Sequence, residues 1–102
     1  MSKAVFFNSY KLKKGVNTSE FVSAAEQLTT EHISKQKGYI SSNLLVDGEV
    51  WADEIVFETL EDMKTFVELS NSTKNELADK FYSFINFNSC VTRYFTVEKN
   101  FK

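Results

Sequence analysis

The sequence has no proline, one cysteine, one histidine and three glycines among its 102 residues. A single cysteine, Cys90, excludes a disulfide within the chain and favours a reducing compartment. One histidine and one thiol do not provide the ligands of a typical zinc site, so we expect no metal. The glycines Gly15, Gly38 and Gly48 stand alone and form no glycine-rich phosphate-binding loop.

Long hydrophobic runs and an excess of one charge are also missing. No apolar segment approaches the roughly 20 residues of a transmembrane helix, and the first residues lack the features of a secretory signal peptide. Twelve basic and fourteen acidic residues give a net charge of −2. This balance does not attract nucleic acid or an anionic membrane. We therefore expect a cytoplasmic protein that binds neither of them.

Aromatic side chains are abundant. They make up 15% of the sequence, and ten of them are phenylalanine. Together with a hydrophobic content of 42%, they exclude a disordered chain. We expect residues 1–102 to form one domain with its own core.

Capping residues and hydrophobic spacing predict the order of the elements. Asn17 and Thr59 are helix N-caps, each followed by an acidic residue at the third position. Gly38 is suited to the left-handed end of the first helix. Asp47-Gly48 predicts a tight hairpin between two strand-like runs. The predicted strands are 4–12, 39–46, 49–58 and 89–99, and the predicted helices are 18–36, 60–69 and 73–85.

This order, β-α-β-β-α-α-β, predicts an α+β protein with a ferredoxin-like split βαβ fold. Its four-stranded antiparallel sheet carries the helices on one face. The other face of such a sheet is usually polar when it contacts water. Here both faces of the first strand are apolar, with Phe6 and Tyr10 on one side and Val5 and Phe7 on the other. We therefore expect a homodimer that forms through the open sheet face.

A polar residue interrupts the first strand, in the stretch AVFFNSYKLKKG. The two-residue period of a strand places Phe6, Asn8 and Tyr10 on one face. Asn8 is then either a hydrogen-bonded residue of the core or the floor of a pocket. The sequence leaves both interpretations open.

Three segments resemble a known superfamily. They are FFNSYKLKKG before the first helix, QKGYISSNLL after it, and VWADEIVFETLEDMKTF from the third strand into the next helix. They are similar to the dimeric α+β barrel superfamily and, within it, to the proteins related to antibiotic biosynthesis monooxygenases. This resemblance covers nearly the whole chain. It implies the dimeric α+β barrel fold, but its members include oxygenases, haem-degrading enzymes and proteins without assigned activity.

The resemblance implies site residues for two kinds of chemistry. In the haem-degrading members a strand-one asparagine matches Asn8, but their haem-distorting tryptophan falls at Phe57. The helix that supplies their axial histidine corresponds to STKNELADKFYSFI, which has none. In the cofactor-independent oxygenases, pocket asparagine, tryptophan and tyrosine residues correspond to Asn8, Trp51 and Tyr10. This second match favours a monooxygenase without a cofactor that acts on a small aromatic molecule, with Phe6 and Phe57 lining its pocket.

Other residues allow weaker hypotheses. His32 lies on or beside the apolar stripe of the first helix, either as a general base or as a residue that interacts with the helix end. Either Asp53 or Glu54 must face inward or lie at a strand edge. A buried carboxylate would have a raised pKa and could serve as a base, but a surface or interface ion pair, such as one with Arg93, is the favoured interpretation.

Two further functions compete with the oxygenase. The first is a ligand-binding or purely structural homodimer without chemistry. The second is RNA binding, which the topology permits. The third strand, EVWADEIVFE, has four acidic residues and no basic ones, so RNA binding is disfavoured.

Overall fold

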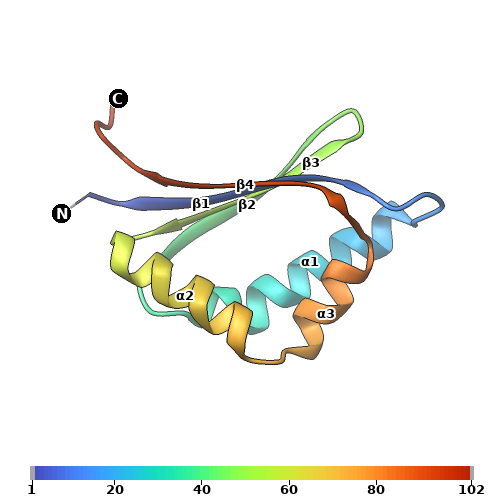
Figure 1. Ribbon diagram of the computed structural model, residues 1–102, viewed down its shortest axis with the longest axis horizontal. Helices are drawn as coiled ribbons and strands as arrows, with labels where there is room; N and C mark the ends of the chain where they lie inside the picture. The colour runs from blue at the N-terminus through green and yellow to red at the C-terminus, as the bar shows by residue number, and fades with distance from the viewer. Residues whose placement is uncertain (1, 102) are drawn as a thin grey trace.

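The computed structural model describes residues 2–101. It consists of a four-stranded antiparallel sheet with all helices on one face (Figure 1). The sheet order is β2-β3-β1-β4. This confirms the predicted α+β fold and its β-α-β-β-α-α-β order. No helix in the described part of the chain is long and apolar enough to cross a membrane. The elements are β1 (Ala4–Leu12), α1 (Thr18–Glu31), the 3-10 helix η1 (Ile33–Lys35), β2 (Tyr39–Asp47), β3 (Val50–Phe57), α2 (Leu60–Ser72), α3 (Glu76–Ser83) and β4 (Ile85–Thr96).

Side-chain caps fix where the helices begin. Asn17 Oδ1 accepts a hydrogen bond from the Glu20 amide at 3.1 Å, and Thr59 Oγ1 accepts one from the Asp62 amide at 3.0 Å. Both predicted N-caps are therefore confirmed. Asn75 Oδ1 accepts from two amides of the first turn of α3, at 2.9 and 3.2 Å. Because Asn75 is the cap, α3 begins later than predicted.

The ends of two helices differ from the prediction. Helix α1 ends at Glu31 because His32 leaves the helical conformation with φ −133°, and η1 follows. Gly38 has the predicted left-handed conformation, with φ +80°. A Cβ atom at Gly38 would clash with the Asp62 carboxylate, so α2 also requires glycine there. Helix α3 ends at Ser83, and β4 begins earlier than predicted.

The strand register brings polar residues together on the face that the helices cover. Asn8 in β1 pairs with Asp53 in β3 and with Thr92 in β4. Paired residues of an antiparallel sheet project to the same side. Asn8 lies on the side of Tyr10, whose ring is in the core. One row across the sheet therefore holds three polar side chains that face the helices.

The core lies between this face and the helices. Phe21 of α1 is fully buried and packs its ring against Trp51 at 5.2 Å and Phe81 at 5.3 Å between centroids. Phe57 is also fully buried and contacts the ring of Phe66 in α2 at 5.2 Å. Truncating such a buried ring to alanine typically costs about 3–5 kcal/mol. These contacts hold the helix layer at a fixed height above the sheet.

The opposite face of the sheet has no helix over it (Figure 1). The residues paired across it include Phe7 with Arg93 and Ser9 with Val91. Val91 remains 51% exposed, and Phe95 remains 49% exposed. The mixed apolar character predicted for the open face is therefore present in the described residues.

Candidate functional site

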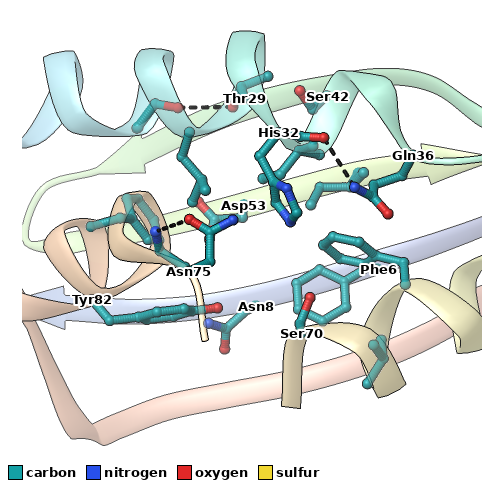
Figure 2. Close-up of a pocket in the computed structure, with 18 of the residues that line it drawn as sticks. Phe6, Asn8, Thr29, His32, Gln36, Ser42, Asp53, Ser70, Asn75 and Tyr82 are labelled. Carbon is teal, nitrogen blue, oxygen red and sulfur yellow. Dashed lines mark hydrogen bonds between the residues drawn. The ribbon is translucent and has the colours of Figure 1, made fainter. Parts of the chain in front are cut away.

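A cavity of about 500 Å³ lies between the sheet and the three helices. Its volume falls within the range of small-molecule sites. Aromatic rings from the sheet and from α2 and α3 form much of its wall, and Figure 2 shows Phe6 and Tyr82 at this wall. The aromatic lining residues are Phe6, Phe66, Phe81, Tyr82, Phe87 and Tyr94. Such a wall suits a flat apolar ligand.

Asn8 lies in the cavity wall with its side chain oriented by β4. The residue is only 4% exposed, and its Oδ1 accepts a hydrogen bond from Thr92 Oγ1 at 2.9 Å. The amide of Asn8 also hydrogen-bonds the side chain of Cys90, and this contact partly opposes the rise that burial causes in the pKa of the thiol. In residues 2–101 Nδ2 donates to no oxygen. One of the two N–H groups of Nδ2 is therefore left for a ligand. Asn8 thus satisfies both interpretations of the sequence: it is hydrogen-bonded and it lines a pocket.

Asp53 also lines the cavity, directly across the strand pair from Asn8. Its Oδ1 accepts a hydrogen bond of 2.7 Å from the hydroxyl of Tyr10. Burial raises the pKa of Asp53 from 3.8 to about 7, and the Tyr10 hydrogen bond partly opposes this rise. A carboxyl with such a pKa can hold or release a proton near neutral pH.

The other titratable side chains at this end of the cavity stay neutral over the same range. Burial raises the pKa of Tyr82 to about 12, and burial together with the charge of Asp53 raises the pKa of Tyr10 above its usual value. Burial also raises the pKa of the Cys90 thiol. No group of three His, Cys, Asp or Glu side chains in residues 2–101 is arranged to hold a metal ion. The site therefore offers proton transfer and hydrogen bonding.

The imidazole of His32 points into the cavity from the end of α1 (Figure 2). Its backbone carbonyl accepts a hydrogen bond from Gln36 Nε2 at 3.2 Å. The last turn of α1 is closed by the backbone N–H of His32, which donates to the Leu28 carbonyl at 3.1 Å. The ring itself makes no hydrogen bond in the described part of the chain, so it is directed at the cavity and not at the helix end.

The structure places the predicted site residues in two groups. Asn8, Phe6 and His32 line the cavity, whereas Tyr10, Trp51 and Phe57 do not. Tyr10 is 1% exposed and lies behind the wall, where its hydroxyl contacts Asp53 and its ring packs against Phe81. Trp51 packs on Phe21, towards the β2–β3 hairpin. The expectation that Phe57 lines the pocket is wrong, because its ring is enclosed beneath α2.

Two polar residues of the site, Thr92 and Tyr82, were not singled out from the sequence, and Asp53 was considered there only as an alternative to Glu54. Thr92 orients Asn8, Tyr82 contributes a hydroxyl, and Asp53 contributes the only acidic group of the wall. The favoured ion pair with Arg93 is wrong for Asp53. Arg93 pairs with Phe7 on the open face, whereas Asp53 pairs with Asn8 on the helix-facing side. The shared strand parity of Asp53 with Ile55 was the signal that could have identified it.

No protein-family model and no curated protein matches this sequence. Solved structures do match it over nearly its whole length. A crystal structure of SnoaB, a cofactor-independent oxygenase from Streptomyces nogalater, matches with a TM-score of 0.76 and 14% identity and covers 98% of this chain and 97% of SnoaB.

Two further structures extend the comparison. The ActVA-Orf6 monooxygenase of Streptomyces coelicolor, in complex with the ligand nanaomycin D, has a TM-score of 0.73 and 13% identity over 99% of this chain and 92% of its own. A dimeric ferredoxin-like protein from an uncultured marine organism has a TM-score of 0.71 and 10% identity over 100% of this chain and 93% of its own. At these identities the likeness shows the fold. The chain has the ferredoxin-like protomer fold of structures that include a cofactor-independent oxygenase and a monooxygenase, as the sequence resemblance implied.

Proposed function

We propose that the protein is a cofactor-independent monooxygenase that acts on a small aromatic molecule bound between the sheet and the helices. The observation that carries the proposal is the cavity of about 500 Å³. It combines aromatic walls with a polar row of Asn8, Asp53 and Thr92. The fold shared with SnoaB and ActVA-Orf6 supports the same chemistry.

The reaction needs an electron-rich substrate, because triplet oxygen reacts with carbanions and phenolates far more readily than with neutral rings. In an anthrone, for example, the CH₂ group between two rings becomes a carbonyl. One oxygen atom of O₂ enters the product, and the other leaves as water with the two hydrogens. The charge that develops on the substrate oxygen needs a nearby donor. The N–H group of Asn8 that does not contact Cys90 is such a donor, and Thr92 holds the amide in place.

Oxygen consumption with anthrone and related quinols tests the proposal. The wild-type protein is expected to consume O₂ and form the quinone without added metal or flavin. Asn8→Ala is expected to lower the rate about 10²- to 10³-fold, which is the typical effect of removing one oxyanion donor. Asn100→Ala, an exposed residue after β4, is the matched control. Undiminished turnover by Asn8→Ala would reject the role of Asn8, and no turnover by the wild type would reject the oxygenase.

A second function is binding without chemistry. The size of the cavity favours a binding site over a purely structural protein, since it exceeds the roughly 300 Å³ at the lower end of small-molecule sites. Calorimetric titration with the same aromatic compounds separates the two functions. A ligand that binds and is recovered unchanged in the presence of O₂ supports the binding function.

We also propose that two copies associate through the open sheet face. The face exposes apolar side chains from β2 and β4, with Leu45 at 41%, Val91 at 51% and Phe95 at 49%. An apolar patch on a sheet without a covering layer is typical of an interface between protein chains. A twofold axis would place the same patch on both partners. Structural neighbours described as dimeric support this assembly.

A pair of matched variants tests the dimer. Val91→Lys adds a charge to the open face, whereas Val22→Lys adds it to the outer surface of α1, where Val22 is 40% exposed. We expect Val91→Lys to halve the molar mass measured by light scattering and Val22→Lys to leave it unchanged. A wild-type mass of 11.7 kDa at micromolar concentration would reject the assembly.

A further inference from the structure

Asp53 is a carboxyl group in an apolar wall without a cationic partner. The residues that line the cavity include no lysine or arginine, and Asp53 is their only acidic member. A buried carboxylate without a counter-ion is costly to keep ionised. Such a group is usually retained where it exchanges a proton with something that enters the site.

The two oxygens of this carboxyl have different surroundings. Oδ1 accepts the hydrogen bond from Tyr10, whose hydroxyl lies behind the wall. In residues 2–101 Oδ2 forms no hydrogen bond. Every fully enclosed side-chain oxygen in these residues does have a partner, so Oδ2 is not fully enclosed. Oδ2 is therefore open to the cavity. Tyr10 fixes the orientation of the carboxyl while leaving one oxygen free to take a proton.

We propose that Asp53 is the proton acceptor of this site and that Oδ2 removes an acidic C–H or O–H proton from a neutral aromatic ligand. The bond between hydrogen and the ligand breaks, an O–H bond forms at Oδ2, and the electron pair stays on the ligand as an enolate or phenolate. One negative charge thus passes from Asp53 to the ligand. The proposal rests on the proposed function for its aromatic substrate class.

The surroundings of Asp53 favour this transfer. Asn8 lies across the strand pair from Asp53, and its remaining N–H group can donate a hydrogen bond to the ligand oxygen on which the charge appears. The hydroxyl of Tyr82 points into the same space in Figure 2. A ligand that already carries a carboxylate or a phosphate would find no lysine or arginine among the lining residues and would be repelled by the ionised form of Asp53. The expected substrate is therefore neutral when it enters.

The titratable groups that face Asp53 come from four elements. They are Tyr10 of β1, Tyr82 of α3, Cys90 and Tyr94 of β4, and His32 at the end of α1. The lining residues of α2 and β2 contain no titratable side chain. The raised pKa values of Tyr10, Tyr82 and Cys90 keep these three groups neutral near pH 7. The ring of His32 also faces the cavity, and His32→Gln tests its contribution separately from that of Asp53.

Deuterium exchange without oxygen tests the proton transfer separately from the oxidation. Anthrone is incubated with the protein in anaerobic D₂O, and deuterium at its CH₂ group is measured by mass spectrometry. We expect the wild-type protein to accelerate exchange and Asp53→Asn to slow it at least about 100-fold, the lower range for a general base. Asp47→Asn is the matched control, because Asp47 is an exposed carboxyl at the end of β2. His32→Gln is expected to keep the pH dependence of the wild type.

The outcomes distinguish the two proposals. Exchange that depends on Asp53 without any oxygen consumption would retain the proton acceptor and reject the oxygenase. Oxygen consumption with exchange unaffected by Asp53→Asn would retain the oxygenase and reject the proton acceptor. No acceleration by the wild type would also reject the proton acceptor. Restoration of exchange in Asp53→Gly by added formate would further support a direct role, because a merely structural carboxyl would not be replaced by a small free base.

Discussion

Replacing Asp53 by asparagine should stabilise the protein, and the gain should depend on pH. Asparagine keeps the shape of the side chain and can still accept the Tyr10 hydrogen bond through its carbonyl oxygen. It removes the charge that burial makes unfavourable. The pKa of Asp53 is raised on folding, so its contribution to stability is fully present below the pKa of the unfolded chain. That contribution is lost as the pH rises through the folded value.

The size of the effect follows from the two pKa values. The pKa of Asp53 rises from 3.8 to about 7 on folding. This is a difference of about 3 pH units, and each of them corresponds to about 1.4 kcal/mol. The wild-type protein should therefore lose about 4 kcal/mol from this group between about pH 4 and about pH 8. That is a large part of the 5–15 kcal/mol that stabilises a typical domain. Asp53→Asn should show no such loss.

Urea denaturation at a series of pH values, followed by far-UV circular dichroism, measures this difference. The free energy of unfolding of Asp53→Asn should equal that of the wild type near pH 4 and exceed it by about 4 kcal/mol near pH 8. Asp47→Asn carries the same chemical change at an exposed site and should follow the wild-type profile. A constant difference between Asp53→Asn and the wild type at every pH would show that Asp53 is not a buried carboxyl with a raised pKa.

Other substitutions should act at all pH values. Gly38→Ala should destabilise the protein by more than the roughly 1–2 kcal/mol that a left-handed alanine costs, because its Cβ atom would also clash with Asp62. Gly15 has φ +78° and open space around it, so Gly15→Ala should lose only the conformational part. Equal losses in urea denaturation would contradict the clash. Thr92→Val removes the hydrogen-bond donor to Asn8 and should lower the free energy of unfolding by about 1–3 kcal/mol at every pH. A loss of stability that depends on pH in the same assay would instead show that Thr92 is coupled to Asp53.

Local signals in the sequence predicted the fold well. The N-caps at Asn17 and Thr59 and the turn at Asp47-Gly48 act over a few residues, so their structure follows from nearby chemistry. The bounds of β1 agree with the prediction, because the polar segment KKGVN ends its apolar run. The start of α3 was missed because the cap at Asn75 overrides the apolar spacing around it.

The site was harder to predict because it depends on contacts between distant segments. Strand parity placed Asn8 and Tyr10 on one face, but it did not show that the Tyr10 ring would be enclosed by Phe21 and Phe81. Parity also left Asp53 either inward or outward. The register between β1 and β3 decides this, and it joins residues about 45 positions apart. No local pattern fixes a pairing over that separation.

Tyr10 provides a separate test of the inferred proton site, because its hydroxyl affects the pKa of Asp53. Tyr10 donates its hydroxyl to Asp53, and this hydrogen bond lowers the pKa of the carboxyl. Tyr10→Phe should therefore raise the pKa of Asp53 further and move its titration to higher pH, whereas Asp53→Asn abolishes the titration.

Carbon-detected NMR of labelled aspartate measures the Asp53 carboxyl in the wild type and in Tyr10→Phe. The same alkaline shift should appear in the pH profile of deuterium exchange from anthrone, because the base that removes the proton is the group that titrates. A carboxyl signal that moves while the exchange profile stays fixed would mean that some other group takes the proton. A joint shift would identify Asp53 as the base and Tyr10 as the residue that sets its working pH.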